Sequence, residues 1–139
     1  MTTELWLLVA SIVLGFVHIV LQAHCMNLQR GLHWNAGPRD EPAPPLTGVA
    51  GRLDRALRNY LETFAFFAAA VLTAQVTNVH NAFTLWGAWL YVLGRVAYIP
   101  LYAFGVRYVR SLAWNVATLG ILLILFGIIS AALVRAGYS

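Results

Sequence analysis

The sequence predicts an all-α fold, an integral membrane four-helix bundle whose helices run alternately up and down. The first observation is composition: 60% of the 139 residues are hydrophobic and only 10% are charged, whereas a soluble domain is about 25% charged. The second is that long stretches lack any charged residue, and about 20 apolar residues cross a bilayer. Because backbone groups in lipid must be bonded internally, these stretches favour helices. The length predicts one domain, residues 1–139.

The first element is a span over about residues 5–29, which contain no charged residue. Glu4 stands where a secretory signal would be basic, and the apolar stretch exceeds the 7 to 15 residues of a signal core. We therefore expect a mature helix. The single cysteine, Cys25, lies inside this segment, which excludes a disulfide framework and a cysteine-based metal site.

Residues 31–47 hold two glycines and four prolines, a composition typical of a loop. Thr47 is placed to cap the next helix, expected over residues 48–76 with its membrane span over 55–76. The third span is expected over residues 82–105, where Pro100 removes one backbone donor and should kink the helix. The fourth is expected over residues 111–134, where Gly120 and Gly127 favour close helix packing.

All nine basic residues are arginines, and they are distributed asymmetrically. Arg135 stands alone on one side, whereas the first and third connections and the adjoining helix ends hold Arg30, Arg39, Arg52, Arg55, Arg58, Arg107 and Arg110. Positive charge marks the cytoplasmic side, so both termini should face away from the cytoplasm.

One face of the second expected helix is polar: Arg55, Arg58, Asn59 and Glu62 fall at i, i+3, i+4 and i+7. One interpretation is a basic membrane anchor with an Arg58 to Glu62 pair. Against it, an apolar run begins directly after Glu62, at a depth where an unpaired carboxylate costs about 2.5 to 3.5 kcal/mol. We therefore interpret this face as a binding surface.

Arg95 lies near the middle of the third span, where a cation facing the bundle interior is expected to need an anion. Tyr98 and Tyr102 follow on the same face. The other aromatic residues of this region are interpreted as an interfacial belt: Trp86, Trp89, Tyr91 and Tyr108.

These arginines, together with Arg110, exceed the acidic charge of Glu62 and therefore call for an anionic ligand. Guanidinium groups bind carboxylates and phosphates in a bidentate manner, while Glu62 suits an ammonium group. A ligand with two carboxylates, one ammonium and a group that can become anionic fits this set. A lipid phosphate fits the arginines but leaves Glu62 unexplained.

The same residues form a recognisable pattern. It consists of R-x-x-x-N-x-x-E (Arg55, Asn59, Glu62), R-x-x-Y-x-x-x-Y (Arg95, Tyr98, Tyr102) and the pair Arg110 and Ser111. Over nearly its whole length the chain resembles the membrane-associated proteins in eicosanoid and glutathione metabolism, the MAPEG family. It is most similar to the small bacterial branch, whose members carry a similar GPRDEP stretch.

The resemblance implies a homotrimer with glutathione, the co-substrate, held between neighbouring subunits, and a transferase or peroxidase acting on lipophilic electrophiles or hydroperoxides. It implies that Arg110 stabilises the thiolate, with Ser111 as a hydroxyl donor. Glutathione binding is expected from Arg30, Arg55, Arg58, Asn59, Glu62, Arg95, Tyr98 and Tyr102. The expected location is the bacterial inner membrane, with periplasmic termini, a site open to the cytoplasm, and membrane lipid and a lipophilic small molecule as partners.

The sequence also departs from the family: Ala65 stands where many glutathione-using members have a proline, and Trp114 stands where some members have a tyrosine. The alternative function is therefore a non-catalytic membrane protein of the same fold that binds an anionic lipid or a thiol-containing ligand. His18 and His24 lie on different faces of the first helix, so no metal site is expected. Nucleic-acid binding is not expected either, because membrane topology accounts for much of the basic charge.

Overall fold

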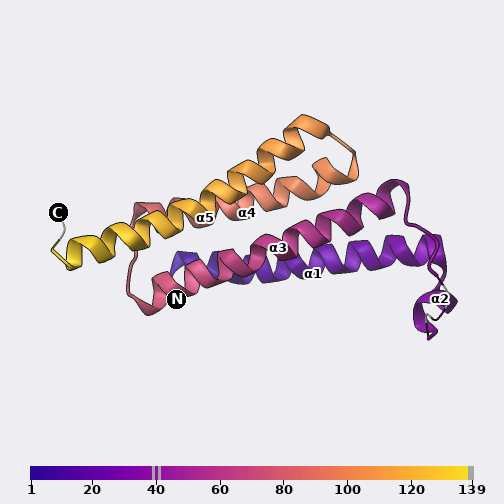
Figure 1. The fold of residues 1–139 in the computed structure, drawn as a ribbon, viewed down its shortest axis with the longest axis horizontal. Coiled ribbons are helices and arrows are strands. Elements are labelled where there is room, and N and C mark those ends of the chain that lie inside the picture. Colours follow the sequence, from indigo (N-terminus) through magenta and orange to yellow (C-terminus); the bar gives the residue numbers. More distant parts are fainter. Residues whose placement is uncertain (39, 41, 138–139) are drawn as a thin grey trace.

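The computed structural model describes residues 1–38, 40 and 42–137, and this part of the chain is all-helical. Its helices are α1 (Thr3–Arg30), α2 (Leu32–Ala36), α3 (Gly48–Val76), α4 (Ala82–Ala103) and α5 (Arg107–Arg135). The long helices α1, α3, α4 and α5 lie side by side, with the start of α1 and the end of α5 toward one end and α2 at the other (Figure 1). Arg39, assigned above to the first basic connection, lies outside the described residues.

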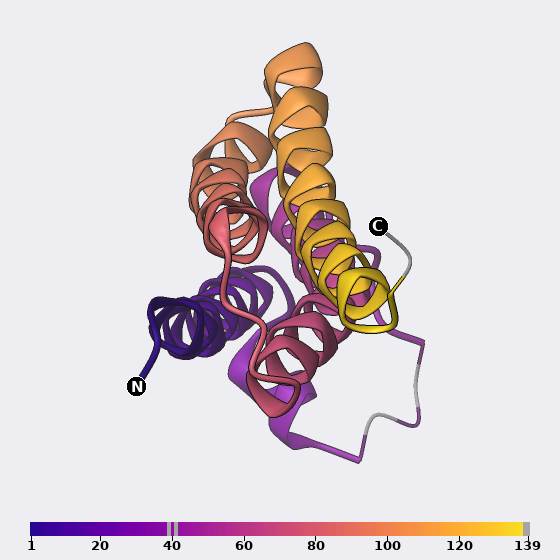
Figure 2. The same ribbon diagram turned by 90° about the vertical axis from the view of Figure 1, so that its left-hand side faces the viewer.

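Two helix pairs make up the bundle: α1 packs on α3, and α4 packs on α5 (Figure 2). The pairs are joined mainly by contacts of α4 with α1 and α3, and by contacts of α3 with α5. In this arrangement α3 and α4 bring Asn59 of the second expected helix against Arg95 of the third.

The expectation of four membrane spans is only partly supported. Within the described residues, three helices are long and apolar enough to cross a membrane, namely α1, α4 and α5. Helix α3 is as long as α5, but its first half carries Arg52, Asp54, Arg55, Arg58 and Glu62. Its uncharged part, residues 63–76, is shorter than the roughly 20 residues that span a bilayer.

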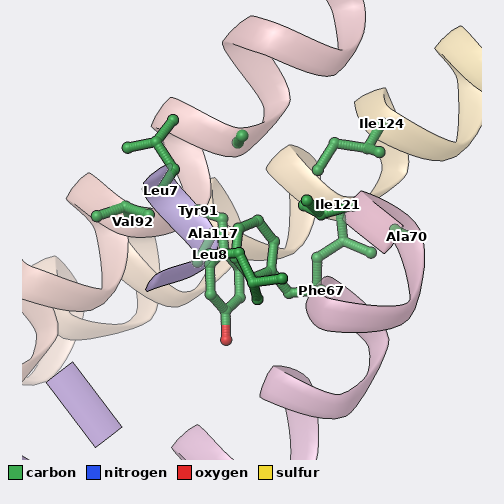
Figure 3. Packing of buried hydrophobic residues seen from close by; sticks show 11 residues of the cluster. Leu7, Leu8, Phe67, Ala70, Tyr91, Val92, Ala117, Ile121 and Ile124 are labelled. Carbon is green, nitrogen blue, oxygen red and sulfur yellow. The ribbon is translucent and has the colours of Figure 1, made fainter. Parts of the chain in front are cut away.

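The centre of the bundle is a cluster of apolar side chains from all four long helices (Figure 3). Phe67 of α3 stacks on Tyr91 of α4, with ring centroids 3.9 Å apart. Tyr91 is fully buried, so its assignment to an interfacial belt was wrong. The rotation of α4 about its axis turns the Tyr91 ring toward Phe67, and the Tyr91 hydroxyl lies 3.4 Å from Thr63 Oγ1. Trp86, by contrast, is 64% exposed on the outside of the bundle.

Glycines let α4 and α5 approach closely. A Cβ atom on Gly87 would lie 2.5 Å from the carbonyl oxygen of Gly120, and a Cβ on Gly120 would lie equally close to the oxygen of Gly87. A Cβ on Gly127 would lie 2.8 Å from Asn81 Oδ1. The packing role expected for Gly120 and Gly127 is therefore confirmed.

The first connection differs from the expected plain loop because it contains the short helix α2. Thr47 is the N-cap residue of α3, as expected, but its side chain does not cap the helix. The side chain of Gln29 binds it instead: Thr47 N donates to Gln29 Oε1 (3.1 Å), and Gln29 Nε2 donates to Thr47 O (2.9 Å). The end of α1 is thereby tied to the start of α3.

The short turns also shape the molecule. Residues 77–81 form the expected turn, with Asn78 in the left-handed region at φ 52°. Helix α4 continues through Pro100 and ends at Ala103, two residues before the expected end. Helix α5 begins at Arg107, earlier than expected, which places Arg110 in its first turn.

Candidate functional site

Arg95 is fully buried in the middle of α4. Its Nη1 donates to Asn59 Oδ1 (2.8 Å), its Nη2 donates to Thr63 Oγ1, and its guanidinium carbon lies 5.6 Å and 5.4 Å from the ring centroids of Tyr91 and Tyr98. The expectation that this cation needs an anion was wrong. Two neutral oxygens of α3 and two aromatic faces of α4 stabilise it, because a guanidinium is weakly hydrated and stacks well on aromatic rings.

Close to Arg95 is a cavity of about 210 Å³ between α3, α4 and α5, which we call the Arg110 pocket. Its lining residues are Asn59, Tyr98, Tyr102, Arg110, Ser111 and Trp114. The guanidinium carbon of Arg110 lies 4.6 Å from the centroid of the Tyr102 ring, and the rings of Tyr98 and Tyr102 are 5.2 Å apart. Five of the predicted site residues thus come together here, and the tyrosines support the arginine.

Arg110 is the chemically distinctive group of this pocket. No carboxylate of the described residues lies within ion-pair distance of it, so its charge is available to a ligand. Ser111 Oγ donates to the carbonyl oxygen of Arg107 (3.3 Å) and must rotate to donate elsewhere. A guanidinium fixed over a ring in a half-buried pocket can stabilise a developing anion.

A second cavity of about 420 Å³, which we call the Arg55 pocket, lies between the end of α1 and the first part of α3. Its lining residues are Arg30, Pro45, Leu46, Gly51, Asp54, Arg55 and Arg58. Arg58 forms an ion pair with Asp54, which also accepts from Gln22 Nε2 (3.2 Å). Arg30 Nε donates to Pro44 O (2.9 Å), so Arg30 is anchored at the rim.

The predicted site residues therefore do not share one cleft within a single chain. Most of them divide between the Arg110 pocket and the Arg55 pocket, Arg95 is buried beside the first, and Glu62 lines neither. The Arg58 to Glu62 pair of the anchor interpretation does not form, because Arg58 pairs with Asp54 and its side chain is 72% exposed. Glu62 is exposed on α3.

The sequence did not predict Asp54, Thr63 or Trp114 as site residues, and Tyr91, whose ring faces Arg95, was assigned to the interfacial belt. Asp54 precedes Arg58 by four positions, and Thr63 follows Asn59 by four, so helical spacing could have found both. Trp114 follows Arg110 by four and was noted only as a departure from relatives. Each missed residue lies one helical turn from a predicted one.

The helices and the buried arginine define the class: an all-helical integral membrane protein with a basic, tyrosine-lined pocket near one end of the bundle. The model of the MAPEG family matches residues 7–130, so the chain belongs to the MAPEG family. This match covers nearly the whole chain and confirms the resemblance that the arginine, asparagine and glutamate pattern predicted. No curated protein and no solved structure gives a significant match.

Proposed function

We propose that this protein is a membrane-bound, glutathione-dependent transferase or peroxidase that acts on lipophilic electrophiles or hydroperoxides. The observation that carries the proposal is Arg110, which has no carboxylate partner among the described residues and lies over Tyr102 in a pocket shared with Ser111. Membership of the MAPEG family, which includes glutathione-dependent transferases and peroxidases, supports it.

The proposed chemistry begins with the glutathione thiol in the Arg110 pocket. Thiolates, not thiols, are the nucleophiles, and a neighbouring guanidinium lowers the pKa of a thiol toward neutrality. Arg110 would stabilise the thiolate, and Ser111, after rotating away from Arg107 O, would donate to it. The thiol proton passes to water, and the substrate enters from the lipid. With an electrophilic carbon, the thiolate forms a C–S bond while the leaving group departs with its electron pair or a conjugated double bond accepts that pair. With a hydroperoxide, the thiolate attacks the terminal oxygen, the O–O bond breaks and the alcohol leaves; a second glutathione then reduces the sulfenic acid, giving glutathione disulfide and water.

The carboxylates, the backbone and the ammonium group of glutathione need binding residues that the Arg110 pocket alone does not supply. Arg30, Arg55 and Arg58 would bind its carboxylates, Asn59 its backbone, and Glu62 its ammonium group. In one chain the Arg55 pocket is bounded by α1 and α3, whereas the Arg110 pocket is bounded by α3, α4 and α5. We infer that the Arg55 side of one subunit meets the Arg110 side of its neighbour in a homotrimer, with Arg95, Tyr98 and Tyr102 shaping the second side.

The proposed homotrimer would also allow α3, which carries charged residues, to cross the membrane as a fourth span. A helix whose exposed face carries both Glu62 and Phe66 is poorly suited to lipid but suited to the inside of an oligomer. With α3 covered by its neighbours, all four long helices cross the bilayer, in the bacterial inner membrane, with periplasmic termini. The arginine-rich end then opens to the cytoplasm, where glutathione is found.

The direct test is to record the ultraviolet thiolate absorbance when glutathione is titrated into detergent-purified protein. We expect a thiolate signal in the wild type and in Arg107→Ala, whose exposed side chain lies one turn earlier on α5. Arg110→Ala should lose the signal and, by analogy with removal of an oxyanion-binding group, on the order of a hundredfold in kcat toward an aromatic electrophile.

A second outcome would favour the alternative function. The Arg110 pocket is lined by Trp114, where some family members have a tyrosine, and Ser111 is bound to a backbone carbonyl. If the wild type binds glutathione without forming a thiolate, the protein is a non-catalytic member of the fold that binds a thiol-containing ligand or an anionic lipid. If it neither binds glutathione nor forms a thiolate, the transferase proposal is wrong.

A further inference from the structure

At the opposite end of the bundle from Arg110, a groove of about 470 Å³ lies between the start of α4 and the end of α5. We call it the C-terminal groove, and its lining residues are Asn81, Ala82, Phe83, Ser130, Ala131, Val134 and Arg135. Figure 1 shows the end of α5 beside the turn between α3 and α4. The walls are mostly apolar, and one end of the groove carries an arginine.

The neutral polar side chains of this groove are already satisfied within the bundle. Asn81 Nδ2 donates to Gly127 O (3.1 Å), and Asn81 Oδ1 accepts from the backbone nitrogens of Phe83 (3.0 Å) and Thr84 (3.1 Å). Ser130 Oγ also donates to Gly127 O (3.1 Å). A ligand in the groove would therefore find apolar walls and the charge of Arg135.

Arg135 is held in place and still has donors to offer. Its Nη1 donates to Thr77 O (2.9 Å) and its Nη2 to Asn78 O (3.2 Å). A guanidinium has five N–H donors in a fixed fork, so these two carbonyl bonds leave others free. The side chain is exposed, and two backbone acceptors orient it beside the groove without neutralising its charge.

The charges of the described residues at this end favour an anion. Glu4 is buried, accepts from Thr84 Oγ1 (2.8 Å) and lies 3.6 Å from His80 Nδ1, so it is turned inward and already engaged. Arg135 is the only arginine that the described residues place at this end, and it ends a helix apolar enough to span the membrane. That position is the depth at which lipid headgroups meet acyl chains.

We propose that the C-terminal groove is a binding site for a phospholipid with an anionic headgroup. The phosphate would accept hydrogen bonds from the free donors of Arg135, and an acyl chain would lie along Phe83, Ala131 and Val134. The bound lipid would bridge the end of α5 and the turn after α3, since Arg135 already contacts that turn. This site is separate from the glutathione site and does not depend on it.

Photo-crosslinking in membranes tests the proposal at the site itself. Phe83→p-benzoylphenylalanine is reconstituted into vesicles of equal parts phosphatidylglycerol and phosphatidylcholine with identical acyl chains, and the lipid adducts are counted by mass spectrometry. We expect phosphatidylglycerol adducts to be enriched about fivefold, the effect of one basic residue near an anionic surface. Arg135→Gln should abolish the enrichment, whereas Arg107→Gln at the other end should leave it unchanged.

The control reporter is Trp86→p-benzoylphenylalanine, which is exposed on the same helix but outside the groove. Its adducts should follow the composition of the vesicle. Val134→p-benzoylphenylalanine is a second reporter in the groove, should the variant at position 83 fail to fold. Adducts in bulk proportion at both groove positions, or crosslinks to a second copy of the chain, would overturn the proposal.

Discussion

Arg95 shows how a charge is kept inside an apolar bundle without a counter-charge. An isolated buried cation costs several kcal/mol in lost hydration, and here Asn59, Thr63 and two tyrosine rings replace the water. Asn59 also lines the Arg110 pocket. The same amide therefore positions a structural cation and forms part of the candidate binding surface.

Replacing Asn59 should accordingly destabilise the protein. Asn59→Ala removes an acceptor from a fully buried guanidinium, and we expect the free energy of unfolding to fall by about 1 to 3 kcal/mol. The measurement is unfolding of the purified protein by increasing mole fraction of a denaturing detergent. Asn115→Ala is the matched control, because its exposed amide donates to the backbone oxygen of Ser111 on the surface of α5. Equal losses in both variants would mean that Asn59 does not support Arg95.

The sequence predicted which residues of α3 and α4 are unusual, but it did not predict their contacts. The helical spacing of Arg55, Asn59 and Glu62, and the depth of Arg95, marked residues that do not belong on a lipid-facing surface. Spacing cannot show which neighbouring helix supplies a partner, so the contacts of Arg95 with Asn59 and Thr63 were not predicted. Tyr91 was misassigned for the same reason, since only the rotation of α4 places it against Phe67.

Among the helices, the clearest contrast lies in how α3 and α4 begin. Asn81 caps α4 with a reciprocal capping box, in which Thr84 Oγ1 accepts from Asn81 N (3.0 Å), and it also binds Gly127 O of α5. Thr47 stands at the same position of α3 but makes no side-chain cap bond. Both residues are typical N-caps in sequence, yet only Asn81 caps its helix with its side chain, whereas Thr47 is bound to α1 through Gln29.

The two caps should differ measurably. Asn81→Ala loses the cap and the bond to α5, so we expect its free energy of unfolding to fall by about 1 to 2 kcal/mol. Thr47→Ala should lose clearly less, since Gln29 binds mainly the backbone of Thr47. Detergent unfolding of both variants decides the matter, and a larger loss in Thr47→Ala would contradict this account.

Helix extents were largely predictable because apolar stretches and glycine- and proline-rich breaks determine them. The predicted helix bounds were wrong mainly in two places, at α2 and at the start of α5. Helix α2 begins directly after Gly31, which has a positive φ of 82°. With only five residues, α2 is too short to show an apolar periodicity in the sequence. The first turn of α5 is polar, so the onset of the apolar run suggested a start later than Arg107.

For the whole molecule, the main finding is that the candidate site is divided. The two pockets share α3, where Arg55 and Asn59 lie one turn apart, but α1 bounds only the Arg55 pocket, and α4 and α5 bound only the Arg110 pocket. Pattern and spacing can group residues along a helix, but they cannot show how a ligand reaches both pockets. A ring of identical chains solves this problem, because a heterologous contact repeated around an axis brings one pocket of each chain to the other pocket of its neighbour.

Subunit complementation distinguishes a site within one chain from a site between chains. Arg55→Ala and Arg110→Ala should each abolish most glutathione-dependent activity when expressed alone. If the protein is the proposed trimer, coexpression in equal amounts gives mixed oligomers in which an Arg110→Ala chain supplies Arg55 and an Arg55→Ala chain supplies Arg110. Random mixing around a closed ring leaves about a quarter of the sites intact, so we expect about a quarter of wild-type activity.

Proteins purified separately and mixed in a detergent that prevents exchange should remain inactive. If coexpression restores no activity while both arginines are individually required, the two residues act from the same chain and the site does not lie between subunits.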